Sequence, residues 1–259
     1  MNEDIRIAYL VGAVMGDGSY THEKNSKIRF YFSSSDKEFI DDIKEIIKEI
    51  FGLNLNIGVK KLSNKNPNWR DHYWISSRTL YNKLCKYLPD KSKIPEFIEN
   101  GDIRIKSSFI GGFFDAEGGV SLSIIKSRNA LDRRIHCSCS NKKILESIKN
   151  YLSEIGIKSF IQNGHRAFVL NIWGFDGLTT FRNYIGFKIF RKNDKLNKSI
   201  DSYKYRKIMW GKEIKNKAEN IRRDYGHSAI KIQKLLYEDT GLEVPKVTIE
   251  KWIYGGHEK

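Results

Sequence analysis

Two carboxylates occupy matching places in two similar segments of the chain. Asp17 follows the apolar segment 10–16 and Glu117 follows segment 110–116, and each acid directly precedes a glycine. We expect both segments to be helices that end in a left-handed glycine cap, which leaves each carboxylate at the negative end of a helix dipole. Two such ends brought together place two anions side by side, and a hard divalent cation such as Mg²⁺ relieves the repulsion. The pair therefore indicates metal-assisted phosphodiester hydrolysis; for either segment alone, an ordinary acid at a helix end is the alternative.

Small residues recur within both segments. Gly12 and Gly16 are four residues apart, as are Gly112 and Ala116. Residues at this spacing share one helix face, and small side chains there let two helix backbones approach closely. An interior glycine costs a helix about 1 kcal/mol, and close packing compensates for that cost. These four residues are predicted to form a helix interface, and Gly16 and Ala116, next to the acids, are also candidate metal-binding positions.

Hydrophobic periodicity predicts the same order of elements twice, which indicates duplication of a domain-sized unit. In the first half, helices are predicted at 5–15, 36–51 and 79–87, and strands at 19–23, 27–34, 55–62 and 69–76. In the second half, helices are predicted at 107–114, 142–155 and 178–185, and strands at 120–125, 133–139, 159–162 and 167–173. Ser35 and Glu38 are spaced as in a capping box. The predicted fold class is α+β, with αββαββα repeats in residues 1–100 and 101–200 related by a pseudo-twofold, followed by a small all-α tail in 201–259.

Both segments resemble the LAGLIDADG motif, and residues 4–199 together resemble the single-chain LAGLIDADG homing endonucleases. The resemblance implies that Asp17 and Glu117 bind the metal. It also implies that the eight strands form two saddle-shaped sheets along the major groove of DNA. At the sixth motif position, where the family often has an acid, the first copy has Met15 and the second has Asp115.

The same resemblance implies a lysine near the metal, after the last helix of each half. Lys91 in segment 88–94 and Lys192 in segment 190–196 match that place. A cation there orients the attacking water or stabilises charge in the transition state. A solvated surface lysine is the alternative for either residue.

Polar and aromatic residues alternate along the predicted strands, which places them on one face of each sheet. The chain has 46 Lys and Arg against 31 Asp and Glu, a formal net charge of +15, so we interpret these faces as DNA-binding rather than merely solvated. The candidate contacts are Lys27, Arg29, Tyr31, Arg70, His72 and Trp74 in the first half, and Ser121, Ser123, Arg134, His136 and Ser138 in the second.

The remaining composition narrows the class of protein. Cys85, Cys137 and Cys139 fit neither a disulfide framework nor a zinc site. No apolar run approaches the roughly 18 residues needed to cross a bilayer, and acids stand at the N-terminus where a signal peptide has basic residues. We expect a soluble protein with no membrane partner, cytoplasmic and nucleoid-associated or, in a eukaryote, organellar.

The tail has a helical pattern of its own, with helices predicted at 218–225, 228–240 and 245–254. It resembles the helix-turn-helix modules of resolvases and transposases, although the link at 239–244 is longer than their usual turn. We expect Lys246 and Lys251 on the last helix to contact DNA phosphates. The apolar face of that helix is predicted to be Val247, Ile249 and Trp252. The alternative is a helical appendage that only packs on the core.

The resemblance and the paired acids predict a site-specific homing endonuclease that makes a Mg²⁺-dependent double-strand break with short 3′ overhangs. Two non-identical halves in one chain favour a monomer acting on a long, non-palindromic DNA site. Two alternatives stay open: a non-catalytic transcription regulator on the same fold, which the presence of both acids argues against, and an RNA-splicing maturase.

Overall fold

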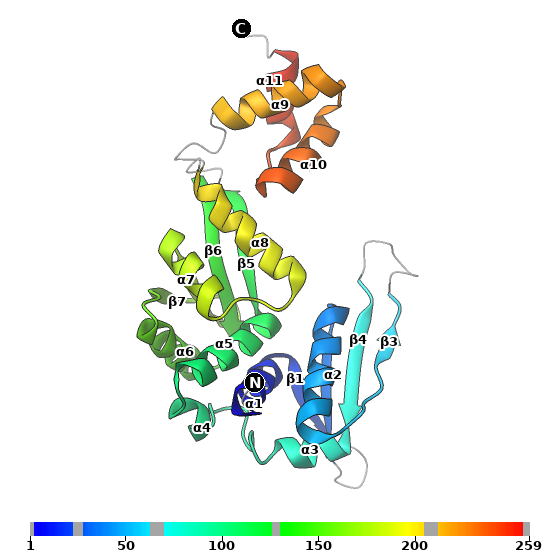
Figure 1. The fold of residues 1–259 in the computed structure, drawn as a ribbon, viewed down its shortest axis with the longest axis vertical. Helices are drawn as coiled ribbons and strands as arrows, with labels where there is room; N and C mark the ends of the chain where they lie inside the picture. The colour runs from blue at the N-terminus through cyan, green and yellow to red at the C-terminus, as the bar shows by residue number, and fades with distance from the viewer. Residues whose placement is uncertain (1–2, 23–27, 63–69, 126–129, 205–211, 256–259) are drawn as a thin grey trace.

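The computed structural model describes residues 3–22, 28–62, 70–125, 130–204 and 212–255, and it shows two similar α/β halves followed by a helical tail (Figure 1). The predicted α+β class is confirmed, because each half contains a four-stranded antiparallel sheet with helices packed against it. Among the described residues, no helix is long and apolar enough to span a membrane.

The first half begins with the helix whose end contains Asp17. Its elements are α1 (Glu3–Asp17), β1 (Gly18–His22), β2 (Ile28–Ser34), α2 (Lys37–Phe51), β3 (Gly58–Lys60), β4 (His72–Ser77), α3 (Arg78–Leu84) and α4 (Glu96–Glu99). The sheet order is β1-β2-β4-β3. Strand β3 is shorter than the predicted strand 55–62, and the predicted site residue Lys27 lies outside the described residues.

The second half repeats this order and ends in a longer final helix. Its elements are α5 (Ile103–Glu117), β5 (Gly118–Ile125), β6 (Ala130–Cys139), α6 (Lys142–Glu154), β7 (Ser159–Asn163), β8 (Phe168–Trp173), α7 (Phe175–Tyr184), α8 (Phe190–Asp201) and the short 3₁₀ helix η2 (Ser202–Lys204). The sheet order β5-β6-β8-β7 matches that of the first half. The division of the chain near residues 100 and 200 stays a prediction.

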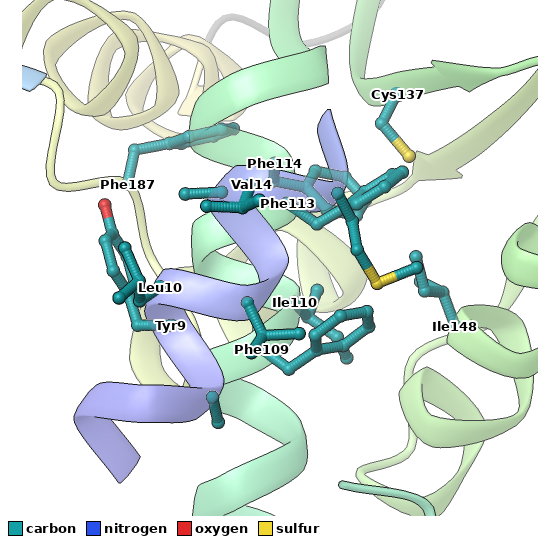
Figure 2. Close-up of a cluster of buried hydrophobic side chains, with 14 of the residues drawn as sticks. Tyr9, Leu10, Val14, Phe109, Ile110, Phe113, Phe114, Cys137, Ile148 and Phe187 are labelled. Carbon is teal, nitrogen blue, oxygen red and sulfur yellow. The ribbon is translucent and has the colours of Figure 1, made fainter. Parts of the chain in front are cut away.

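The core gathers around the crossing of α1 and α5. Figure 2 shows Leu10 and Val14 of α1 beside Phe109, Phe113 and Phe114 of α5, all of them fully buried. The apolar faces of both sheets and the amphipathic helices α2 and α6 complete the same core. Burying such large side chains stabilises the fold by roughly 1.5–3 kcal/mol each.

The tail consists of α9 (Lys212–Tyr225), α10 (Ala229–Thr240) and α11 (Lys246–Tyr254). Its small core includes Leu122 of β5, and Leu131 of β6 packs at its edge, so the tail is docked on the second half. One prediction for α11 is wrong: Val247 is 62% exposed, and Ile249 is its fully buried residue. The face of α11 that packs on the rest of the tail is therefore centred on Ile249, and Val247 faces outward.

The predicted capping box at α2 is also wrong. Asp36, not Ser35, is the N-cap residue, and its side chain makes no capping hydrogen bond. The Glu38 carboxylate instead accepts a hydrogen bond from the main-chain N–H of Phe190 at 2.9 Å. Local spacing could not reveal a partner this distant in the chain.

The glycines after the two acids are not left-handed caps. Gly118 is extended, with φ −97° and ψ 171°, and Gly18 is absent from the residues with positive φ. Both start a strand directly after a helix. A Cβ on Gly18 would lie 2.7 Å from the Val14 oxygen, and one on Gly118 would lie 2.6 Å from the Phe114 oxygen. Glycine is needed here for close approach rather than for backbone conformation.

Candidate active site

Each of the two acids is the last residue of its helix, and the two helices, α1 and α5, contact each other through their small residues. A Cβ on Gly12 would lie 2.1 Å from the Phe109 oxygen, and one on Gly112 would lie 2.0 Å from the Tyr9 oxygen. At the end of this interface, a Cβ on Gly16 would lie 2.5 Å from the Ala116 Cβ. The four small residues predicted for the helix interface thus all lie where α1 meets α5, which brings the two helix ends together.

Asp17 and Glu117 interact electrostatically at these ends. The pKa of Asp17 is raised to about 6, chiefly by burial and in addition by the nearby Glu117, while Lys192 and Lys91 oppose the rise. Partial burial of its carboxyl group also raises the pKa of Glu117, although the residue as a whole is exposed, and the same two lysines again act in the opposite direction. Both carboxylates therefore hold protons more readily than free acids, mainly because they are partly buried, and a bound cation would favour their ionised forms.

The donor set fits a hard divalent cation that keeps part of its coordination shell for water and substrate. Among the described residues, no group of three or more His, Cys, Asp or Glu could hold a metal ion. The protein would thus supply two carboxylates, with main-chain oxygens beside them. Mg²⁺ is commonly bound in this way, by one or two carboxylates together with waters and phosphate oxygens.

Lys192 lies in the first turn of α8 and is 5% exposed. Its Nζ donates hydrogen bonds to the main-chain oxygens of Asp115, at 2.5 Å, and Phe114, at 3.2 Å, at the end of α5. Burial lowers the pKa of Lys192 to about 8, although Asp115 and Asp17 favour the charged form. The lysine thus places a buried positive charge at the negative end of the second motif helix.

Lys91 lies between α3 and α4 and is more accessible. Its Nζ donates a hydrogen bond to the main-chain oxygen of Gly18, directly after Asp17. Burial lowers the pKa of Lys91, whereas Glu117 and Asp17 act in the opposite direction. Both lysines predicted for the site therefore lie at the motif helix ends, but they are anchored differently.

Asp115, the acid at the sixth motif position, is buried, and its carboxylate is bound by groups other than the Asp17–Glu117 pair. Its carboxylate accepts hydrogen bonds from the Tyr9 hydroxyl at 2.7 Å and from the main-chain N–H groups of Lys188 at 3.0 Å and Ile189 at 3.4 Å. It ties the end of α5 to the segment that leads into α8. Met15, at the same motif position in the first half, has no carboxylate with which to make such bonds.

The sequence matches the LAGLIDADG-like domain family over residues 4–89 and 104–186, more than half of the chain. The chain belongs to this family. The match confirms the resemblance inferred from the two motifs, and its two segments correspond to the two halves of the structure.

Two relatives illustrate the range of proteins to which the chain is similar. The chain is 26% identical over 206 residues to the homing endonuclease I-ApeI of Aeropyrum pernix, covering 74% of this chain and 86% of the relative. It is 25% identical over 268 residues to a probable translation initiation factor IF-2 of Methanocaldococcus jannaschii, covering 97% of this chain and 21% of the relative. The chain thus spans only a minor part of that longer protein.

Solved structures share the LAGLIDADG fold. The homing endonuclease I-DmoI in complex with DNA and Ca aligns with a TM-score of 0.54 and 21% identity, covering 76% of this chain and 99% of I-DmoI. The N-terminal LAGLIDADG domain of DUF199/WhiA aligns with a TM-score of 0.53 and 16% identity, covering 77% and 88%. These likenesses establish the fold.

Each LAGLIDADG half has one polar sheet face. In the first half, Phe30, Phe32 and Ile75 point into the core, so the alternate residues of β2 and β4 lie on the opposite face. Tyr31 is paired with Ser76, and the Arg29 guanidinium lies 3.5 Å from the Ser76 hydroxyl. The predicted DNA-binding residues of this half that share the polar face are Arg29, Tyr31, His72 and Trp74.

The other predicted residue of this half, Arg70, lies before β4 rather than on the strand. It forms an ion pair with Asp36 at 3.4 Å.

The second sheet has a corresponding polar face. Ser121 is paired with Arg134, and Arg134 with Trp173, so all three side chains lie on the same face. Arg134 also forms an ion pair with Asp132 at 3.1 Å. Burial lowers the pKa of His136, which lies on this face too. The remaining predicted residues of the face are Ser123 and Ser138.

The candidate DNA contacts of the tail lie on the outer surface of α11. Lys246 forms an ion pair with Glu250 at 3.2 Å, and Lys251 is exposed. Ile249 on the other side of the helix is buried against α9 and α10. Both lysines are thus available to a partner of the tail.

Asp36 and Arg191 form an ion pair beside Lys192 that was not predicted from the sequence. They lie in different halves, so no local spacing joins them. The signal that was available is the position of Arg191 directly before the predicted lysine.

Proposed function

We propose that this chain is a site-specific homing endonuclease that cuts both strands of a long, non-palindromic DNA site and leaves short 3′ overhangs. The observation that carries the proposal is the pair Asp17 and Glu117 on adjoining helix ends, with raised pKa values. The relative I-ApeI bears the name homing endonuclease, and I-DmoI structures contain DNA together with Ca, Mn or Mg. These relatives support the same activity here.

In this proposal the carboxylates of Asp17 and Glu117 hold Mg²⁺, and the main-chain oxygens of Gly16 and Ala116 are further candidate ligands. Bound Mg²⁺ would polarise the scissile phosphate and lower the pKa of the attacking water. Lys192 and the less buried Lys91 place positive charge beside the helix ends. There they would stabilise the negative charge that develops on the phosphate during cleavage.

The proposed partner is double-stranded DNA, bound by one copy of the chain. The net charge of +15 attracts a polyanion, and the two polar sheet faces supply donors that suit base edges and phosphates. The two faces differ in sequence, so a monomer would recognise two unlike half-sites. We further propose that the tail, residues 201–259, adds phosphate contacts through Lys246 and Lys251.

Selection from a randomised duplex library tests this function. Purified protein is incubated with the library and Mg²⁺, and the cut ends are sequenced. We expect one long site without palindromic symmetry, 3′ overhangs, and no product when EDTA replaces the metal. If the protein binds DNA but cuts none of it in Mg²⁺ or Mn²⁺, a regulator without nuclease activity becomes the better account.

A further inference from the structure

The N-terminal end of α8 is held by carboxylates from both halves of the molecule. Asp115 of the second half accepts hydrogen bonds from the main-chain N–H groups of Lys188 and Ile189. Glu38 of the first half accepts one from the main-chain N–H of Phe190 at 2.9 Å. The start of α8 is therefore fixed between the end of α5 and the start of α2.

A bidentate ion pair between Asp36 and Arg191 also holds the start of α8. The Nε of Arg191 donates to one oxygen of the Asp36 carboxylate at 2.7 Å, and its Nη2 donates to the other at 2.5 Å. The Asp36 side chain is only 12% exposed, and Arg70 approaches the same carboxylate at 3.4 Å. Bidentate pairs of this kind fix geometry as well as charge.

Arg191 directly precedes Lys192, so the ion pair fixes the main chain from which the buried lysine extends. The Lys192 side chain then reaches the Phe114 and Asp115 oxygens. A lysine has a flexible four-carbon stem and makes no fork-like contact of its own, so its position depends on where its backbone is held.

The corresponding contact in the other half is weaker. Asn141, the N-cap residue of α6, donates a hydrogen bond from Nδ2 to the main-chain oxygen of Ser92 at 2.8 Å, directly after Lys91. This contact also crosses between the halves, but it is a single neutral hydrogen bond. An uncharged bond contributes roughly half as much as a charge-assisted one.

We propose that Asp36 and Arg191 are positioning residues for Lys192, so that an acid of the first half fixes the lysine that the second half contributes to the site. The inference rests on the proposed nuclease function. Because Lys192 is anchored at the end of α5 and Lys91 beside Asp17 at the end of α1, loss of the ion pair disturbs only the Lys192 side of the site. Cleavage of one DNA strand should then slow much more than cleavage of the other.

The test measures cleavage of each strand separately. Arg191→Ala is compared with the wild-type chain in single-turnover reactions with Mg²⁺, on a selected site labelled on opposite strands. We expect the rate on one strand to fall about tenfold or more, since small misplacements of a catalytic group have such costs, while the other strand changes little. Nicked DNA should accumulate, and the affinity for DNA in Ca²⁺ should stay within about twofold of wild type, because the contact acts on positioning.

Two further variants examine the same contact. Asp36→Asn removes the partner and should slow the same strand. Arg191→Lys keeps the charge and should recover part of the lost rate. If Arg191→Ala is poorly folded, the strand ratio of Asp36→Asn decides the question.

The matched control is Arg104→Ala. Arg104 also pairs with the N-cap aspartate of a helix, Asp102, with Nε at 3.1 Å and Nη2 at 2.8 Å, but this exposed pair does not contact either lysine. Both strands should be cut at wild-type rates. Equal slowing of both strands by Arg191→Ala, or a loss of affinity with unchanged strand rates, would overturn the positioning role. A wild-type chain that cuts no DNA would overturn the proposed function itself.

Discussion

Asp17 is the more buried of the two acids, and its raised pKa of about 6 means that ionising it opposes folding. An aspartate in the unfolded chain titrates near 3.8. The native state therefore binds the proton more tightly, so stability decreases as the pH rises from about 4 to about 6 and stays lower above that range. The proposed role of the carboxylate pair in binding the metal accounts for this cost.

Asp17→Asn is accordingly expected to stabilise the protein without metal. At pH 7.5 in EDTA the free energy of unfolding should rise by about 1–3 kcal/mol, since each unit of pKa shift corresponds to about 1.4 kcal/mol. The gain should vanish below about pH 4, where the wild-type acid is protonated. Urea denaturation at both pH values measures it. Asp201→Asn, which changes an exposed acid at another helix end, should alter stability by only a few tenths of a kcal/mol.

The two lysines should differ in their response to pH. The pKa of Lys192 is lowered to about 8, so its positive charge is lost as the pH rises through that value and beyond. The single-turnover cleavage rate in saturating Mg²⁺ should therefore decrease on the alkaline side, at pH 8 or somewhat higher once the DNA phosphates are bound. Lys192→Met should lower the rate on one strand about 10²–10³-fold and remove this alkaline decrease. A variant that keeps the decrease would show that another group causes it; Lys91→Met is the matched comparison.

At the scale of the elements, periodicity predicted the repeated order of helices and strands because each amphipathic segment faces one shared core. It missed α8, whose buried residues include Lys192 and Ser199 as well as Leu196 and Ile200. A buried lysine in the first turn interrupts the apolar stripe that marks a helix. Both acids lie at the helix ends where the sequence placed them, and Lys91 follows α3 as expected. Lys192, expected after the last helix of its half, instead lies in the first turn of the missed helix α8. The Asp36–Arg191 pair depends on packing between the halves and could not be predicted.

The motif helices provide a direct test of close packing. The Cβ of Gly112→Ala would lie 2.0 Å from the main-chain oxygen of Tyr9 if nothing moved. The helices α1 and α5 must therefore separate to accommodate it. We expect a loss of about 2–4 kcal/mol in the free energy of unfolding, by analogy with other overpacked cores. Gly111→Ala is the control, because its nearest neighbours lie at 3.8 Å and alanine favours the helix. Equal stability of the two variants would show that the interface is looser than described.

At the scale of the whole molecule, the halves are similar in fold but unlike in detail, and the tail packs on the second half. Leu122 of β5 belongs to the core of the tail, so removal of the tail would expose part of the second half. Point changes are therefore a better probe of the tail than deletion. Its role in binding cannot be read from the sequence, because resemblance to a helix-turn-helix does not show which surface meets DNA.

Lys246→Ala combined with Lys251→Ala should weaken DNA binding in proportion to the phosphates that the tail contacts. Each lost contact reduces the slope of log affinity against log salt by about 0.9. We expect a reduction of up to about 1.8 for the double variant, with the cleavage rate at saturating protein unchanged. Lys149→Ala, on the helix that covers the apolar face of the second sheet, should leave the slope unaltered. An unchanged slope in the tail variant would indicate that the tail only packs on the core.

The proposed nuclease activity depends most directly on Asp17 and Glu117, which together would hold the metal. Asp17→Asn and Glu117→Gln are prepared separately and assayed on a selected site, for cleavage in Mg²⁺ and for binding in Ca²⁺. We expect that neither variant makes a double-strand break, while both bind the site with an affinity close to that of the wild-type chain. Full cleavage activity in either variant would contradict it.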